Sequence, residues 1–398
     1  MCFDLVILGL PAYLLIRPFS GKLFRTYMGH LINYTTPIVF NTPMIISGSK
    51  LHATHDSMGF YENKVKANNS LMLANHGSRI DWMIGMFVGY INKPNRVRVG
   101  FVCERVIQYM PLIGWYRRLV CEDVFVDRSF NVDKINIATN LDSFHNDDIS
   151  RQMYLSPEGV VVDFGERDQK YVQACREFCT DFGMEPFDYV LTPRYKGQTV
   201  LCNQIKDIGK GLGTIASITT AFVRDGKLLN CEMTSDQRVI PDIYSLCSGV
   251  GGSPVHIYIH LHELYFNPDS DIKTIMMKDY ERKNTVLKEW HTMLKAGKLE
   301  EFENQFVAFE PNVLQAQLIQ ALHVIMQLLF FNYFGKLYQY FTGCVCLFLL
   351  VSTSHTVGWM LNSTSMESVP FETAIKGIMM ALMPSTRKHK GTEDKKTN

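Results

Sequence analysis

The sequence predicts an α/β fold, with a mixed central sheet flanked by helices, an apolar N-terminal segment and a C-terminal transmembrane helical hairpin. Between about residues 60 and 270, short apolar runs typical of buried strands alternate with segments whose apolar residues recur at helical spacing. Apolar residues crowd both ends of the chain, and charged residues crowd its middle. Residues 340–361 contain no Asp, Glu, Lys or Arg. These observations separate a folded middle from membrane-seeking ends.

The composition excludes several classes of protein. Of 398 residues, 46% are apolar and 20% are charged, so the chain can bury a sizeable core and is not disordered overall. The 40 Lys and Arg residues and 39 Asp and Glu residues give a net charge of +1, which argues against a nucleic-acid partner. The 10 cysteines include no Cys-x-x-Cys pair, so we expect reduced, buried thiols.

Residues 1–50 are expected to form a membrane-associated segment. Residues 5–16 read LVILGLPAYLLI, which is shorter than the roughly 20 residues of a simple span. No basic region precedes this run, so it resembles a re-entrant or signal-anchor segment more than a cleaved signal peptide. Residues 28–46 are a weaker apolar candidate. A buried N-terminal helix of a soluble domain is the alternative.

Residues 60–270 are expected to form the α/β domain. The predicted strands are 70–74, 97–103, 123–126, 152–155, 188–191, 215–222 and 255–261. The predicted helices include 81–90 and 133–144. Residues 271–310 then form a charged, amphipathic helical segment whose apolar stripe is expected to dock on the core; a lipid-facing role is the alternative.

The C-terminal hairpin is expected over 315–362. Its second half has Tyr340 near one end and Trp359 near the other, where interfacial anchors lie. A fully buried helix of a soluble domain is the alternative. Residues 384–398 form a charged cytosolic tail, and Lys395 and Lys396 match the di-lysine pattern of endoplasmic-reticulum membrane proteins. We therefore expect an endoplasmic-reticulum membrane location.

The segment with the most chemical information is NHGSRID, residues 75–81. His76 follows a predicted strand, and Asp81 stands where a helix should begin, so the carboxylate can reach Nδ1 of the imidazole. Such a pair leaves Nε2 as the outward-facing base. A capping Asp beside an unrelated His is the alternative. Ser78 is a poor nucleophile candidate, because Gly-x-Ser-x-Gly is absent.

Two later segments strengthen the dyad interpretation. VFVDR ends a predicted strand with Arg128, a residue suited to phosphate, and YLSPEG places Glu158 and Gly159 in a turn after another strand. With NHxxxxD as the first block, VFVDR as the second and YLSPEG as the third, they resemble the four-block pattern of the glycerolipid acyltransferase superfamily (the 1-acylglycerol-3-phosphate acyltransferase type). YVLTPR, which contains Pro193, corresponds to the fourth block of this pattern. The resemblance covers about residues 70–225.

Within this superfamily the sequence is most similar to the lysocardiolipin/lysophosphatidylinositol acyltransferase branch. The Asp81-Trp82 pair, VLTPR and the C-terminal apolar hairpin carry this finer resemblance. One departure is Val160, which stands where the family has Thr or Ser after Glu-Gly, so a hydrogen bond near the acceptor phosphate is in doubt.

The resemblance implies an acyl-CoA-dependent enzyme of phospholipid remodelling. Its acceptor would be lysophosphatidylinositol, lysocardiolipin or lysophosphatidylglycerol, and a lipid bilayer would be its surroundings. His76, oriented by Asp81, would deprotonate the acceptor hydroxyl, which attacks the thioester without an acyl-enzyme intermediate. Arg128, Glu158, Gly159 and Pro193 would bind substrate. No metal or other cofactor is implied, and no oligomeric state is indicated.

Three other interpretations remain open. One is a 1-acylglycerol-3-phosphate acyltransferase that makes phosphatidic acid, and another is a catalytically silent lipid-binding membrane protein. The third is a serine lipid hydrolase, for which we find no nucleophile elbow. His256, His260 and His262 share one face of a predicted strand and resemble a zinc site, but a solvated strand face is the expected explanation.

Overall fold

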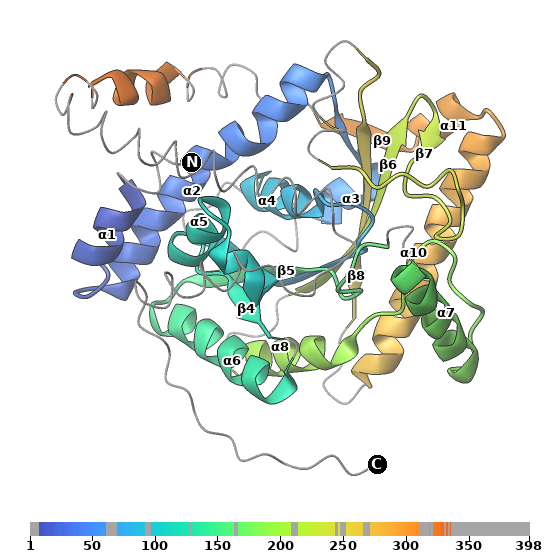
Figure 1. Ribbon diagram of the computed structural model, residues 1–398, viewed down its shortest axis with the longest axis horizontal. Helices are drawn as coiled ribbons and strands as arrows, with labels where there is room; N and C mark the ends of the chain where they lie inside the picture. Colours follow the sequence, from blue (N-terminus) through green and yellow to red (C-terminus); the bar gives the residue numbers. More distant parts are fainter. Residues whose placement is uncertain are drawn as a thin grey trace.

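The computed structural model describes residues 8–60, 70–91, 97–127, 129–162, 166–207, 214–242, 246, 252–265, 271–309, 318, 321–329, 332 and 335. These residues form one nine-stranded sheet in the order β4-β3-β5-β2-β6-β8-β1-β9, with β7 paired to β6. Helices lie on both sides of the sheet (Figure 1). The predicted α/β class with a mixed central sheet is confirmed.

The strands include both parallel and antiparallel neighbours. β4, β3, β5, β2 and β6 are parallel, β8 runs antiparallel to β6, β1 is parallel to β8, and β9 is antiparallel to β1. Their bounds are β1 Leu51–Thr54, β2 Ser70–Ala74, β3 Val97–Glu104, β4 Val124–Val126, β5 Ser150–Leu155, β6 Thr214–Arg224, β7 Lys227–Leu228, β8 His256–Leu264 and β9 Phe306–Phe309.

Eleven labelled helical segments surround this sheet in the described residues. They are α1 Leu10–Leu15, α2 Gly21–Ser47, α3 His55–Phe60, α4 Asp81–Ile91, η3 Arg105–Tyr109, α5 Ile113–Leu119, α6 Phe130–Asn146, α7 Glu166–Asp181, α8 Tyr195–Asp207, α10 Ile272–Lys295 and α11 Leu299–Glu303. The predicted helices at 81–90 and 133–144 correspond to α4 and α6. The expected docking of 271–310 on the core is confirmed, because Met276 and Tyr280 of α10 belong to the main apolar cluster.

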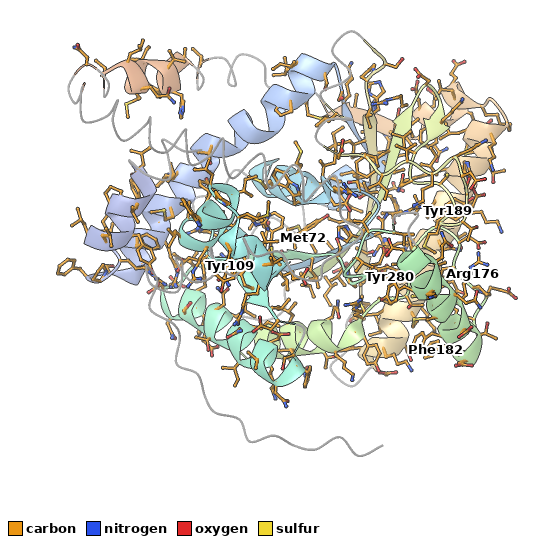
Figure 2. All side chains as sticks on the ribbon, in the orientation of Figure 1. Met72, Tyr109, Arg176, Phe182, Tyr189 and Tyr280 are labelled. Carbon is orange, nitrogen blue, oxygen red and sulfur yellow. The ribbon has the colours of Figure 1, made fainter. Side chains whose placement is uncertain are left out.

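Strand β2 lies at the centre of the sheet, and its residues are buried on both faces. Leu71 and Leu73 pack in the cluster that includes side chains of α6, α8 and α10. Met72 and Ala74 pack in the opposite cluster with α4. Side chains alternate between the two faces of a strand, so a continuous apolar run is what a doubly covered strand requires. Figure 2 shows Met72 and Tyr280 among the side chains that fill the centre of the molecule.

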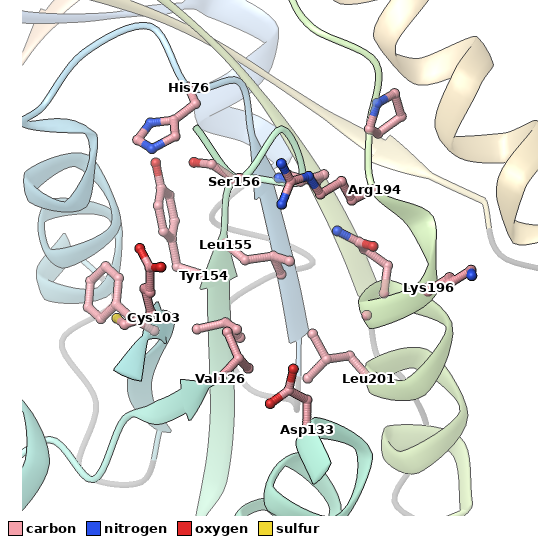
Figure 3. A pocket seen from close by; sticks show the side chains of 18 of the residues that line it. His76, Cys103, Val126, Asp133, Tyr154, Leu155, Ser156, Arg194, Lys196 and Leu201 are labelled. Carbon is pink, nitrogen blue, oxygen red and sulfur yellow. The ribbon is translucent and has the colours of Figure 1, made fainter. Parts of the chain in front are cut away.

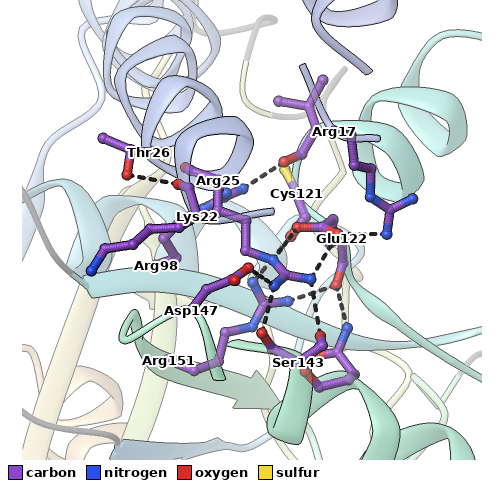
Figure 4. Close-up of polar contacts among 12 residues, drawn as sticks. Arg17, Lys22, Arg25, Thr26, Arg98, Cys121, Glu122, Ser143, Asp147 and Arg151 are labelled. Carbon is purple, nitrogen blue, oxygen red and sulfur yellow. Dashed lines mark hydrogen bonds and ion pairs between the residues drawn. The ribbon is translucent and has the colours of Figure 1, made fainter. Parts of the chain in front are cut away.

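The N-terminal helices are tied to the sheet by buried charges (Figure 4). Nε of Arg25 in α2 lies 2.9 Å from Oε2 of Glu122, and both side chains are 7% exposed. Arg17 contacts the other oxygen of Glu122 at 3.1 Å, and Arg25 also pairs with Asp147. Arg98 of β3 donates from Nη1 to the carbonyl oxygen of Arg25 at 2.9 Å. Residues 8–47 therefore dock on the α/β domain through specific ion pairs as well as through the apolar contacts of α1, α2 and α5.

The prediction of a strand at 188–191 is wrong. These residues join no ladder, and side chains bind their backbone amides instead. Oδ1 of Asn284 accepts from the amides of Asp188 and Tyr189 at 2.8 and 2.9 Å, and Oε2 of Glu158 accepts from Leu191 at 3.2 Å. The apolar run at 188–191 reflects burial. A buried segment outside the sheet can be as apolar as a buried strand.

The expected solvated face of β8 is also wrong in part. Tyr258 is 1% exposed because side chains of α11 and β9 pack on its ring. His262 is buried, with Nε2 3.0 Å from Oδ1 of Asp279 in α10. His256 and His260 remain partly exposed. Sequence alternation alone did not reveal that α10 and α11 cover this face.

Most of the predicted C-terminal hairpin at 315–362, and all of the predicted tail at 384–398, lie outside the described residues. Residues 321–329 are helical, and Leu322, Leu328 and Leu329 are exposed there. No helix within the described ranges is both long enough and apolar enough to cross a membrane. The six described cysteines, Cys103, Cys121, Cys175, Cys179, Cys202 and Cys231, are free and buried, as expected.

Candidate active site

The loop between β2 and α4 carries the predicted dyad at the carboxyl end of the central strand. Asn75 prolongs the pairing of β2 with β6, because its side chain accepts from the amide of Thr220 at 2.7 Å and donates to the carbonyl of Thr220 at 3.1 Å. Asn230 donates to the same carbonyl at 3.0 Å and lies against Gly77, where an added Cβ would come within 2.6 Å of its side chain. The backbone on both sides of His76 is therefore held in place.

His76 and Asp81 form the predicted pair. Nδ1 of His76 lies 2.8 Å from Oδ2 of Asp81, the first residue of α4. Oδ2 also accepts from the amide of Ser78 at 3.2 Å, and Oδ1 accepts from the Ser78 hydroxyl at 2.6 Å. The carboxylate thus orients the imidazole and closes the loop. The Ser78 hydroxyl is bound to Asp81, so it is not presented as a nucleophile.

The surroundings favour a basic imidazole. Burial lowers the pKa of His76, but the hydrogen bond and charge of Asp81 and the charge of Glu158 outweigh it, and the pKa is raised. The side chain of His76 is 28% exposed, against 3% for Asp81. With Nδ1 bound to Asp81, Nε2 is the nitrogen available to a substrate.

Glu158 braces this site from the third sequence block. Its Oε1 accepts from the amide of His76 at 2.8 Å, and its Oε2 accepts from the amide of Leu191 at 3.2 Å. Burial raises the pKa of Glu158 to about 7. One carboxylate therefore connects the first, third and fourth blocks through backbone hydrogen bonds. A direct contact of Glu158 with substrate stays a prediction.

The other predicted residues divide into two groups. Gly159 and Pro193 line the pocket beside His76. Gly159 has a φ of +72°, a backbone conformation that favours glycine. Arg128 lies outside the described residues, so its predicted contact with phosphate stays a prediction.

The pocket has a volume of about 750 Å³. Figure 3 shows His76, Ser156 and Arg194 at one end, and Val126, Leu201 and Asp133 at the other. Apolar lining comes from β4, α6 and α8 and includes Val126, Phe130, Ile137, Val200 and Leu201. Tyr154 and Arg194 line the same space and were not singled out from the sequence. Tyr154 is the residue of β5 just before Leu155-Ser156-Pro157-Glu158, so its position next to the third block was an available signal.

The described residues contain no group of three or more His, Cys, Asp or Glu side chains arranged to hold a metal ion. The histidines of β8 have protein partners instead. Nδ1 of His260 lies 3.0 Å from the Thr54 hydroxyl, and His262 contacts Asp279.

Comparisons with known proteins agree with the block pattern. Residues 58–184 match the family model described as Acyltransferase. The chain is 25% identical over 187 residues to lysophosphatidylinositol acyltransferase 10 of Caenorhabditis elegans, covering 47% of this chain and 45% of the relative. It is 26% identical over 207 residues to lysocardiolipin acyltransferase 1 of Mus musculus, covering 52% and 49%.

A third similar protein is 1-acyl-sn-glycerol-3-phosphate acyltransferase epsilon of Mus musculus. The identity is 27% over 155 residues, covering 39% of this chain and 40% of the relative. The chain spans about half the length of the first two curated relatives. The matched family segment contains the His76–Asp81 pair and Glu158.

Proposed function

We propose that this chain, which belongs to the glycerolipid acyltransferase superfamily, transfers a fatty acyl group from acyl-CoA to the free hydroxyl of a lysophospholipid. The observation that carries the proposal is the 2.8 Å contact between Nδ1 of His76 and Oδ2 of Asp81 at the edge of a large pocket. The names of two relatives, lysophosphatidylinositol and lysocardiolipin acyltransferases, favour a phospholipid-remodelling acceptor.

In the proposed reaction, Nε2 of His76 takes the proton of the acceptor hydroxyl as the oxygen attacks the thioester carbonyl. Asp81 stabilises the imidazolium that forms. The carbon–sulfur bond then breaks, the CoA sulfur leaves as the thiol after it receives the proton, and the acyl group remains on the acceptor oxygen. His76 is the only protein side chain that changes protonation state in this scheme, because it takes the proton from the acceptor hydroxyl and gives it to the CoA sulfur. Glu158 acts through the backbone of His76 and is a positioning residue.

The pocket suits two substrates of this kind. Its lining includes three cationic side chains, Arg79, Arg194 and Lys196, and these cations suit phosphate groups. Its apolar lining from α6 and α8 suits a hydrocarbon chain. Arg128 is proposed to add a further contact with the acceptor phosphate.

We also propose that the chain works at the endoplasmic-reticulum membrane. Leu14, Leu15, Phe19 and Leu23 are exposed near the junction of α1 and α2, and Phe19 is 88% exposed. Large exposed apolar side chains in one region suit a lipid surface. Lys395 and Lys396 supply the di-lysine pattern. Co-fractionation with endoplasmic-reticulum markers, and its loss after both lysines are replaced by Ser, would test this location.

The activity is tested by incubating membranes that contain the full chain with labelled acyl-CoA and a panel of lysophospholipids. The panel includes lysophosphatidylinositol, monolysocardiolipin, lysophosphatidylglycerol and 1-acylglycerol-3-phosphate. His76→Ala should abolish transfer and leave the chain folded and membrane-bound. His55→Ala, at an exposed histidine of α3, is the matched control and should keep wild-type activity. Full activity in His76→Ala would overturn the mechanism.

A further inference from the structure

Arg194 lies beside the turn that carries Glu158 and Gly159, although 35 positions separate it from Gly159 in the sequence. Its amide donates to the carbonyl of Pro157 at 2.9 Å. A Cβ on Gly159 would stand 3.3 Å from the guanidinium carbon of Arg194. The fourth sequence block therefore places a cation directly over the third block, on the pocket wall that also contains Ser156 (Figure 3).

The side chain of Arg194 is held at its inner nitrogen. Nε donates to the hydroxyl of Tyr171 in α7 at 3.2 Å, and the guanidinium carbon lies 5.5 Å from the centre of the Tyr171 ring. Within the described residues, no carboxylate pairs with Arg194, and its terminal nitrogens make no other hydrogen bond. The outer edge of the guanidinium therefore remains available in an open pocket.

The third block offers a neutral hydroxyl, that of Ser156, on this wall, but no cationic side chain. Val160 follows Gly159 and packs in an apolar cluster with Val162 and Leu191. Glu158 is buried and uses both oxygens on backbone amides. Three acidic residues line the pocket, and none belongs to this turn: Asp81 is paired with His76, Glu104 belongs to β3 and Asp133 to α6. A ligand oxyanion beside Gly159 would therefore meet Arg194 as its charged partner from this wall.

We propose that Arg194, held by Tyr171, forms a phosphate-binding subsite next to His76. A guanidinium fork matches two oxygens of a phosphate, and Tyr171 fixes the plane of that fork before the ligand arrives. Arg79 and Lys196 also line this pocket and add positive charge to it. The subsite supplies from the fourth block the polar contact that Val160 cannot make. This inference rests on the proposed acyl transfer for the identity of its ligands.

Two phosphate sources are compatible with the subsite, the acceptor lysophospholipid and CoA. An acceptor phosphate at Arg194 would orient the glycerol hydroxyl toward Nε2 of His76. A CoA phosphate at Arg194 would position the thioester instead. The shared chemistry is a phosphate oxyanion, and separate titration of the two substrates distinguishes the sources.

The test uses the full chain in phosphatidylcholine nanodiscs. Equilibrium dissociation constants are measured for two probes, free CoA and lysophosphatidylinositol, and KM is measured for oleoyl-CoA and lysophosphatidylinositol. Arg194→Gln should raise the dissociation constant of one probe by about 10- to 100-fold and raise the KM of the corresponding substrate by a similar factor. Arg194→Lys should recover part of the loss, because it keeps the charge and loses the fork. Tyr171→Phe should give a smaller loss in the same substrate.

The control is Lys227→Gln, which removes an exposed positive charge on β7 and should change neither constant. Equal thermal unfolding midpoints for wild type and Arg194→Gln exclude misfolding as the cause of a loss. The subsite is refuted if Arg194→Gln binds both probes with wild-type affinity, or if Lys227→Gln weakens probe binding as much as Arg194→Gln does. If the wild-type chain binds the probes but transfers no acyl group, the proposed function fails, and the binding measurements still decide the subsite.

Discussion

The ammonium group of Lys283 lies 3.1 Å from the carbonyl oxygen of Leu73, although the two residues are 210 positions apart. Lys283 belongs to α10 and is fully buried. The next carbonyl, that of Ala74, accepts a hydrogen bond from the hydroxyl of Tyr280 at 3.2 Å. Helix α10 therefore holds the end of β2 immediately before His76, from outside the segment that matches the family model.

Lys283→Met should destabilise the protein strongly. The Lys283 ammonium lies 2.5 Å from Oδ2 of Asp279, and neither side chain is exposed. Removal of the lysine leaves a buried carboxylate whose other contact is His262, and burial lowers the pKa of His262. Breaking a buried pair in this way costs about 3–5 kcal/mol. Thermal or denaturant unfolding of the purified chain measures the loss. Lys288→Met, at an exposed lysine of the same helix, should change stability little. Equal midpoints for the two variants would contradict this prediction.

Asp81→Asn should change both the rate and its pH dependence. Neutral His76 is the base, and the pKa of His76 is raised by Asp81, so kcat/KM of the wild type should rise with pH through a value above 6.5. In the variant, the acid limb of the profile should move to lower pH, because the Asp81 charge that raises the pKa of His76 is gone. The maximum of kcat/KM should be lower by about 10²- to 10⁴-fold. Initial rates of acyl transfer between pH 5 and 9 check this. An unchanged acid limb would show that another group sets the profile.

Glu158→Gln should alter the pH dependence of stability. Burial raises the pKa of Glu158 to about 7 from an ordinary 4.5, so the folded state binds this proton more tightly than the unfolded state does. The contribution of Glu158 to stability is therefore fully present below about pH 4.5 and is lost as pH rises through 7. The variant lacks this decline, and its stability relative to wild type should increase between pH 5 and 8. Unfolding midpoints across that range test the sign, with Glu185→Gln, at an exposed glutamate, as the control.

The same substitution should reduce activity. The side-chain nitrogen that replaces one carboxylate oxygen of Glu158 cannot accept from a backbone N–H, so one of the two bonds to His76 and Leu191 is lost. We expect a fall in kcat of about tenfold with a smaller change in KM, because Glu158 positions His76 and does not line the pocket. A pure increase in KM would instead indicate direct contact with substrate.

Glu122→Gln should loosen the N-terminal helices. Glu122 pairs with Arg25 and Arg17, and burial of Arg25 makes the lost charge costly, at about 3 kcal/mol. Limited proteolysis should cut residues 8–47 faster in the variant than in wild type. Lys22→Gln removes an exposed charge, 3.9 Å from Asp148, and should leave the cleavage rate unchanged. Equal protection in Glu122→Gln would mean that the apolar contacts alone hold α2.

Local patterns predicted much of the fold and the dyad. The apolar run 70–74, the turn after it and the helix that begins at Asp81 are adjacent in the chain, so short-range geometry brings Asp81 to His76. The segment 188–191 was misread because burial makes a run apolar whether or not a neighbouring strand pairs with it. The histidines of β8 were misread because alternation does not reveal a helix packed over one face.

The sequence by itself determined the α/β class and the His76–Asp81 pair, because these depend on periodicity within single segments and on two residues five positions apart. The order of the four blocks can be read directly along the chain. The tertiary structure decided the rest of the site. It brought the two carboxylate oxygens of Glu158 to the amides of His76 and Leu191, which belong to two other blocks. It also set Arg194 against Gly159 and brought Lys283 to the carbonyl of Leu73 at the end of β2. These contacts join residues far apart in the chain, which meet only after the parallel strands align their carboxyl ends and α10 packs across them. No spacing along the sequence encodes that convergence directly.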